Sequence, residues 1–255
     1  VAVVRTRELH RAGRRKVPYP IVAIVGYTNA GKSTLFNRVT GASVLAKDQV
    51  FATLDPTMRE LKLATGRRII LSDTVGFISD LPTMLVAAFR ATLEEVIEAD
   101  LILHVRDIAH AETDAQASDV EGVLRDLGID TVSADSHILE VWNKIDLLTP
   151  EHREEAFSAA RFKERQPAVV SAVTGEGLDA LSTLIDARLG ATDIVVDVVV
   201  PAAAGKLLHW LYENAEILSR DTADDGSTRL KLRIGPEKRN QLDAQLKRAG
   251  VPVQR

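Results

Sequence analysis

The chain has 255 residues, more than one typical domain, and its 45% hydrophobic content is enough to build a full core. The absence of cysteine excludes disulfides, thiol catalysis and thiolate metal sites, and no run of about 18 apolar residues suggests a membrane span. The formal net charge of −4 conceals basic ends: residues 1–16 carry a net +5 and residues 229–255 a net +6, which leaves −15 between them.

Apolar runs of strand length alternate with helical stretches through the first 190 residues. The runs cover residues 21–25, 58–64, 68–73, 100–106, 137–142 and 166–171, and the helical stretches cover 32–39, 83–98, 112–127, 151–162 and 177–188. This alternation predicts an α/β domain with a mostly parallel six-stranded sheet covered on both faces, as in Ras-like domains. Only a short turn, residues 64–67, separates the second and third runs, so those two strands must pair antiparallel.

The segment after the first strand has the form of a phosphate-binding loop. Residues 26–33 match the pattern G-x-x-x-x-G-K-[ST], and a helical stretch follows. Backbone N–H groups of such a loop surround nucleotide phosphates, Lys32 would reach the β- and γ-phosphates, and the Ser33 hydroxyl would ligate Mg²⁺. By itself the pattern also fits a glycine turn before an ordinary helix. The expected nucleotide contacts here are Gly26, Tyr27, Thr28, Asn29, Ala30, Gly31, Lys32, Ser33 and Thr34.

Three further short motifs each close a predicted strand. Asp73-Thr74-Val75-Gly76 would hold the Mg²⁺ shell through water at Asp73 and the γ-phosphate at the Gly76 amide. Asn143-Lys144-Ile145-Asp146 suits guanine, because the Asp146 carboxylate can accept from both the ring N–H and the exocyclic amine. Ser171 and Ala172 would back the base. Four motifs in this order predict a GTP-binding protein.

The P-loop together with two other segments resembles the HflX family of translational GTPases. These segments are Phe51-Ala52-Thr53-Leu54-Asp55-Pro56-Thr57 and Asp73-Thr74-Val75-Gly76-Phe77-Ile78. The resemblance implies a GTPase that associates with the large ribosomal subunit, its rRNA and proteins, and splits or rescues stalled or stress-damaged ribosomes. The related Obg or TrmE-like GTPases, acting in ribosome assembly or RNA modification, are the alternative. HflX proteins also carry a large N-terminal domain and a helical linker, so we expect this chain, which begins Val1-Ala2, to be a fragment.

The switch segments supply the remaining expected site residues. Phe51, Ala52, Thr53, Leu54 and Asp55 would border the nucleotide in a switch loop spanning residues 40–57. Thr53 is the expected threonine that completes the Mg²⁺ shell, with Thr57 in the same loop as the alternative. Phe77 stands where Ras-type enzymes carry a water-orienting glutamine, so we expect slow hydrolysis without a partner. In TrmE-like GTPases an asparagine at this place in the P-loop helps to hold K⁺, so the resemblance implies that role for Asn29, with stabilisation of the turn as the alternative.

Beyond the predicted GTPase domain, residues 193–255 predict a small β-α-β-β-α domain. Strands are expected at 194–200, 216–219 and 228–234, a helix from Pro201 through Tyr212, and a last helix from Pro236 to about Arg248. The organisation is therefore a basic linker remnant at 1–16, a GTPase domain at 17–192 and a small α+β domain at 193–255. The basic ends suit contact with RNA phosphates or form solvated helix faces. We expect a cytoplasmic monomer.

Overall fold

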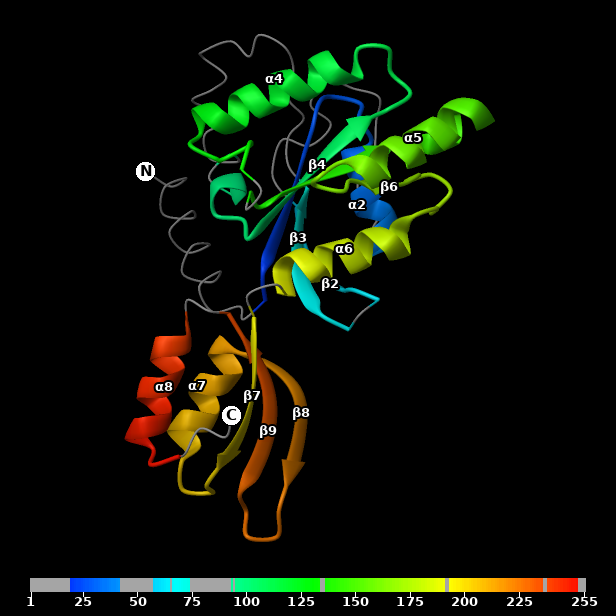
Figure 1. The fold of residues 1–255 in the computed structure, drawn as a ribbon. Coiled ribbons are helices and arrows are strands. Elements are labelled where there is room, and N and C mark those ends of the chain that lie inside the picture. The colour runs from blue at the N-terminus through cyan, green and yellow to red at the C-terminus, as the bar shows by residue number, and fades with distance from the viewer. Residues whose placement is uncertain are drawn as a thin grey trace. The chain divides into compact units, whose positions relative to one another are not determined.

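A computed structural model of the chain describes residues 19–41, 57–64, 66–73, 93, 95–133, 136–190, 193–235 and 238–251. Residues 20–189 form one compact unit, and the second begins at Gly190. Each unit has its own core, and we describe them separately (Figure 1). No helix in the described ranges is both long and apolar enough to cross a membrane.

The first unit is built on a six-stranded sheet whose order is β2-β3-β1-β4-β5-β6. The strands are β1 (Ile21–Val25), β2 (Thr57–Lys62), β3 (Arg68–Asp73), β4 (Leu101–Asp107), β5 (Ile138–Asn143) and β6 (Ala168–Val169). Every pair is parallel except β2 with β3, which are antiparallel and joined by a short turn. The predicted α/β fold with a mostly parallel sheet is confirmed, including the antiparallel pair.

Helices cover both faces of this sheet (Figure 1). They are α2 (Lys32–Thr40), α4 (Thr113–Asp126), α5 (Pro150–Phe162) and α6 (Leu178–Gly190), with a short 3₁₀ helix η1 at Ile145–Leu147. Alternate residues of β1 divide between two cores, as side chains of a strand must. Val22 and Ile24 pack in one core with residues of α2 and α6, while Ala23 and Val25 pack in the other with residues of α4.

The predicted strands and helices of this unit agree with the structure within two residues at each end wherever they are described. The strand expected at 166–171 is the most shortened, because it is reduced to Ala168–Val169. The Val170 amide still donates to the carbonyl of Trp142 in β5, but the Val170 carbonyl accepts from Ile145, and the amide of Ser171 donates to the carbonyl of Glu176. Most of the helix expected at 83–98 lies outside the described residues.

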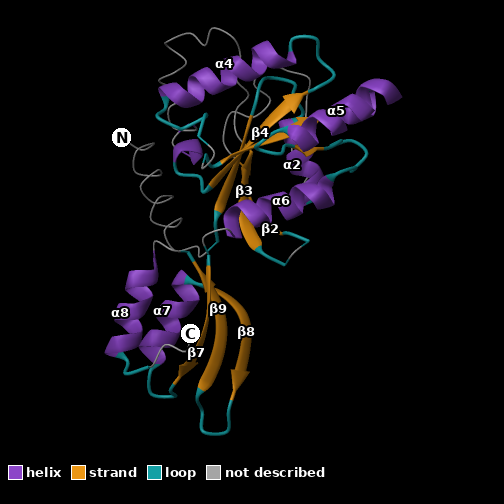
Figure 2. Cartoon of the chain, in the orientation of Figure 1, coloured by secondary structure: helices purple, strands orange, loops and turns teal. Residues whose placement is uncertain are grey.

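The second unit is a three-stranded antiparallel sheet of order β7-β9-β8 with two helices on one face (Figure 2). Its elements are β7 (Ile194–Val200), α7 (Gly205–Asn214), β8 (Glu216–Thr222), β9 (Thr228–Ile234) and α8 (Arg239–Arg248). The apolar side chains of β9 alternate inward, and Leu230 and Leu232 are fully buried against the helices. The expected α+β unit is confirmed.

Three boundaries of the second unit differ from the expectation. The last helix, expected from Pro236, begins at Arg239 with Lys238 as its N-cap, while residues 236–237 lie outside the described part of the chain. The helix expected from Pro201 begins at Gly205, because Pro201–Ala204 forms a turn closed by the Ala204 amide on the Pro201 carbonyl (2.9 Å). Strand β8 runs three residues beyond Ser219, since its polar end still pairs with β9 across the hairpin turn.

Candidate nucleotide-binding site

The parallel strands bring most of the sequence motifs to one edge of the sheet. Ile24 of β1 lies opposite Asp73 of β3, and Val105 of β4 lies opposite Val141 of β5, so the loops that follow these strands start side by side. In open α/β sheets, ligands bind outside the carboxyl ends of the strands. The described residues that gather there are Gly26–Thr34, Asp73, Asn143, Lys144, Asp146, Ser171 and Ala172.

The two glycines of the P-loop are required by close approaches of other chain segments. A Cβ added at Gly26 would lie 2.2 Å from the carbonyl oxygen of Val105, and one added at Gly31 would lie 2.3 Å from the side-chain nitrogen of Asn143. Gly31 also has a φ of 93°, in the left-handed region that favours glycine, and it caps the start of α2. The loop is therefore pressed against β4 and the Asn-Lys-x-Asp motif with no room for side chains.

Lys32 is the buried cation of this loop. Its side chain curls back so that Nζ donates to the carbonyl of Tyr27 at 2.7 Å, and the residue is 7% exposed. Burial lowers the pKa of Lys32 to about 8, although the Asp73 carboxylate raises it in part. An anion placed beside this ammonium would favour its charged form. The group is thus poised to respond to a phosphate.

Asn143 links three segments of the site through its buried amide. Its Nδ2 donates to the carbonyl of Ala30 in the P-loop at 2.9 Å, and its Oδ1 accepts from the amide of Ala172 at 2.9 Å. Both donor and acceptor of the side chain are used within the protein, and the residue is 1% exposed. Asn143 therefore holds the P-loop and the Ser-Ala loop in place next to the end of β5, a role that the sequence motif did not reveal.

The next residues present the guanine-recognition side chain. Lys144 has a left-handed backbone (φ 68°), and its ammonium binds the carboxylate of Asp107 at the end of β4 at 2.7 Å. Asp146 follows in η1, and its Oδ1 is buried with no hydrogen-bond partner in the described chain. A buried carboxylate oxygen without a partner is costly unless a ligand supplies the donor. Asp107 was not among the expected residues, although its place after an apolar strand was a usable signal.

The loop with Ser171 and Ala172 is held by a tight turn. The Ser171 hydroxyl accepts from the amide of Thr174 at 3.0 Å, and the Thr174 carbonyl accepts from Arg38 of α2 at 3.0 Å. A Cβ at Gly177 would lie 2.1 Å from the carbonyl of Val169, so this turn too packs on the sheet. The contacts tie the Ser-Ala loop to the helix that follows the P-loop.

Several expected site residues lie outside the described part of the chain: Phe51, Ala52, Thr53, Leu54, Asp55, Thr74, Val75, Gly76 and Phe77. Thr57, the alternative switch threonine, is described. The expectation that it sits in a loop is wrong, because Thr57 is the first residue of β2 and pairs with Asp73 of β3.

Comparisons with known proteins agree with this arrangement. Two family models match, one described as 50S ribosome-binding GTPase over residues 21–144 and one as HflX C-terminal domain over residues 158–254. GTPase HflX of Magnetococcus marinus is 43% identical over 99% of this chain and 56% of its own length, and GTPase HflX of Escherichia coli is 41% identical over 91% and 53%. The chain thus spans about half the length of these relatives.

Among solved structures, a GTP-binding protein from Sulfolobus solfataricus in complex with GDP is 28% identical, with a TM-score of 0.50 over 73% of this chain and 56% of that chain. The fold, the matched family models and the identity to HflX proteins along nearly the whole sequence agree. The chain belongs to the HflX family of GTPases.

Proposed function

We propose that this chain binds guanine nucleotides at the sheet edge, hydrolyses GTP, and associates with the large ribosomal subunit in its GTP state. The observation that carries the nucleotide proposal is Asp146 Oδ1, a buried acceptor with no partner in the described chain, held next to the P-loop by Asn143. Guanine offers such a carboxylate two donors, its ring N–H and its exocyclic amine, and adenine does not present this pair. The hydrogen bonds to a charged acceptor are each worth about 1.5–3 kcal/mol.

Within this proposal each group of the site has a role toward the nucleotide. Lys32 leaves the Tyr27 carbonyl and binds the β- and γ-phosphates, while the P-loop amides and the start of α2 bind the phosphate oxygens. Ser33 and Asp73 fit Mg²⁺, since a hydroxyl in the first turn of α2 and a buried carboxylate at the end of β3 are hard oxygen donors, with Asp73 acting through water. The ion would neutralise charge on the phosphates. Gly76 would bind the γ-phosphate, and Thr53 would complete the ion's shell.

Hydrolysis by the isolated chain is expected to be slow, because Phe77 replaces the glutamine that orients water in Ras-type enzymes. We propose that Asn29 assists by holding K⁺ against the phosphates. Asn29 has a φ of 60°, and asparagine tolerates this left-handed conformation, so turn stabilisation is the competing role. Faster hydrolysis in K⁺ than in Na⁺, abolished by Asn29→Ala, is the expected result; equal rates in the two salts would leave Asn29 with the turn alone.

The ribosomal part of the proposal rests on the family. HflX membership and the description of the matched model, 50S ribosome-binding GTPase, support the large subunit, its rRNA and proteins, as the partner. Splitting or rescue of stalled ribosomes is the role that we propose from the family resemblance. In this proposal the nucleotide state gates binding to the subunit, and hydrolysis resets it. We further propose that the protein works as a monomer in the cytoplasm. An Obg- or TrmE-like role in ribosome assembly or RNA modification is the alternative.

Cosedimentation with purified large subunits tests the proposal. The chain should pellet with subunits in a non-hydrolysable GTP analogue and remain in the supernatant with GDP, and turnover should rise severalfold when subunits are added. Lys32→Ala is the matched control, because it should lose both responses while the fold remains. Equal pelleting in the two nucleotide states would contradict gated binding, and no change in turnover would remove the ribosome as activator.

A further inference from the structure

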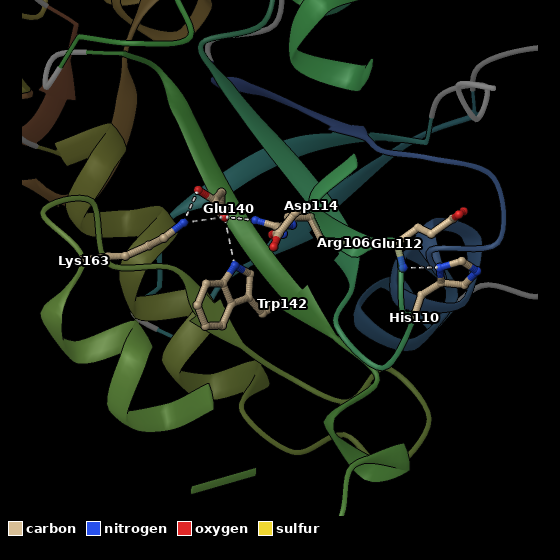
Figure 3. A network of polar contacts seen from close by, with 7 residues as sticks. All are labelled: Arg106, His110, Glu112, Asp114, Glu140, Trp142 and Lys163. Carbon is tan, nitrogen blue, oxygen red and sulfur yellow. Dashed lines mark hydrogen bonds and ion pairs between the residues drawn. The ribbon is translucent and has the colours of Figure 1, made fainter. Parts of the chain in front are cut away.

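A groove of about 580 Å³ lies beside the ends of β4 and β5. It is lined by Arg106 and Trp142 of these strands, by the loop after β4, by the start of α4 and by α5. Figure 3 shows Arg106 and Trp142 with their polar neighbours. Arg106 and Trp142 immediately precede Asp107 and Asn143, and successive side chains of a strand point to opposite faces. The groove is therefore separated from the nucleotide site by the sheet, and nothing in the nucleotide chemistry uses it.

The Arg106 guanidinium is held rigidly in the groove. Its side chain is only 10% exposed, and Nη1 donates to Glu140 Oε2 at 3.0 Å. Glu140 in turn accepts from the Trp142 indole N–H at 2.8 Å and from Lys163 at 3.0 Å (Figure 3). Burial would raise the pKa of Glu140, but these hydrogen bonds and the charges of Lys163 and Arg106 outweigh it and lower the pKa to about 2. Glu140 therefore stays ionised and fixes the orientation of Arg106.

The opposite edge of the guanidinium is only half used. Nη2 donates to a single oxygen of Asp114, and Nε is buried without any hydrogen-bond partner in the described chain. The Nε and Nη2 groups together form the fork that binds a carboxylate through two parallel bonds. Thr113 lines the same groove, and its hydroxyl is also buried and without a partner in the described chain. An unpaired buried N–H and hydroxyl are unusual in a finished core and indicate a place for a ligand.

Asp114 is well suited to give way to such a ligand. Its side chain is 94% exposed even while it binds Arg106, so little desolvation holds it there and it can swing into water. A ligand carboxylate would then replace Asp114 as the partner of Arg106, with Lys163 also lining the groove to offset its charge. The surrounding walls are lined by small apolar side chains, Ala109, Ala156 and Ala159 among them, and the volume lies in the range of small-molecule sites.

We propose that this groove is a second binding site, for a small carboxylate with a compact apolar body. The ligand's carboxylate displaces Asp114 and takes the Nε–Nη2 edge of Arg106 with two hydrogen bonds, and the Thr113 hydroxyl supplies a third. The body of the ligand lies between the loop after β4 and the alanines of α5.

The test follows the indole N–H of Trp142 by ¹H–¹⁵N NMR in the whole chain saturated with GDP and Mg²⁺, so that the P-loop is occupied. The chain has two tryptophans, and Trp210→Phe assigns the signal. Titration with benzoate should shift it, while neutral benzamide, of the same shape, should not. Asp114→Ala should tighten benzoate binding at least threefold because no internal carboxylate competes. Asp126→Ala, an equally exposed acid at the other end of α4, should leave it unchanged.

Arg106→Lys keeps the charge but removes the fork, and should weaken benzoate binding at least tenfold with the rest of the spectrum intact. Equal shifts with benzoate and benzamide would overturn the proposal, as would an unchanged affinity in Asp114→Ala or the absence of any shift in both parent and Asp114→Ala. If Arg106→Lys unfolds, the Asp114→Ala and Asp126→Ala pair still decides between the two outcomes.

Discussion

The nucleotide edge of the first unit and the sheet of the second unit use charged residues in opposite ways. At the nucleotide edge, Lys32 at the start of α2 and Asp73 at the end of β3 are buried, and the carboxylate favours the charged form of the ammonium. In the second unit, Arg229, Lys231 and Arg233 alternate with apolar residues along β9. Their neighbours across the sheet are acidic: Asp221 lies opposite Arg229, Asp197 lies opposite Lys231, and Arg233 binds Glu216 at 3.1 Å.

Because of this difference, the net charge of +6 counted over residues 229–255 overstates the positive charge that this segment offers to a partner. Three of its cations are balanced across strands, whereas Arg239, Lys247 and Arg248 on α8 are exposed and form no ion pair within the described chain. A buried charge interacts strongly with a few groups, while exposed charges act weakly and through their sum. Substitutions at the nucleotide edge should therefore have much larger effects than those on the second unit.

The largest effect is expected for Gly31→Ala. The added Cβ would lie 2.3 Å from the side chain of Asn143, and the positive φ of this residue disfavours alanine. The P-loop and the Asn143 side chain that binds it therefore cannot both keep their positions. We expect GDP affinity to fall at least a hundredfold by calorimetry. Gly41→Ala is the control: its φ of 66° carries similar strain, about 1–2 kcal/mol, but no atom lies within 4 Å. Equal losses of GDP affinity in both variants would show that backbone strain, and not the contact with Asn143, causes the effect.

Next in size is the specificity change in Asp146→Asn. The variant should bind GTP at least tenfold more weakly and prefer xanthosine nucleotides. Xanthine has an acceptor where guanine has its exocyclic amine, and the amide of asparagine can donate to it. Competition binding with GTP, XTP and ATP measures both effects. Native protein that binds ATP as tightly as GTP would remove the role assigned to the buried Oδ1.

The buried ammonium gives a pH dependence of about the same size. The pKa of Lys32 lies near 8, below its ordinary value, so the charge that binds phosphate is present at pH 7 and lost as the pH rises through 8. GDP affinity should fall about tenfold between pH 7 and pH 9, on the basis of the fraction protonated. Lys32→Ala should bind weakly with no such step. A flat profile in the native protein would mean that the ammonium is charged throughout.

The smallest effect separates the two basic elements of the second unit. Neutralising Lys247 and Arg248 to glutamine should lower the salt slope of binding to large subunits by about 1.4–1.8, from roughly 0.7–0.9 per phosphate contact. The matched pair Arg229→Gln and Lys231→Gln should change it less, because acidic residues already lie opposite those charges. The salt slopes are measured from affinities for large subunits at several salt concentrations. GDP affinity is the control, because it should be the same in both variants. A native slope in the Lys247 and Arg248 variant would make α8 only a solvated helix face, and an equal fall in both variants would contradict the difference between the two elements.

Much of the fold could be predicted because the central strands β1, β4 and β5 are apolar, mostly buried runs. The antiparallel β2–β3 pair followed from the short turn between them. The errors fall where tertiary contacts override local pattern. Val170 and Ser171 have strand composition but bond to Ile145 and Glu176, and Pro201–Ala204 closes as a turn before α7 can begin.

The sequence by itself determined the class of nucleotide and the order of the motifs, because a phosphate loop and a guanine motif are encoded in a few adjacent residues. The contacts that hold these motifs together follow from the tertiary structure alone. Asn143 lies 113 residues from Ala30 along the chain, and the Asp107–Lys144 pair depends on the register of β4 with β5. Such contacts depend on which strands become neighbours. The same register places Arg106 beside Glu140, and so creates a groove that no local motif announces.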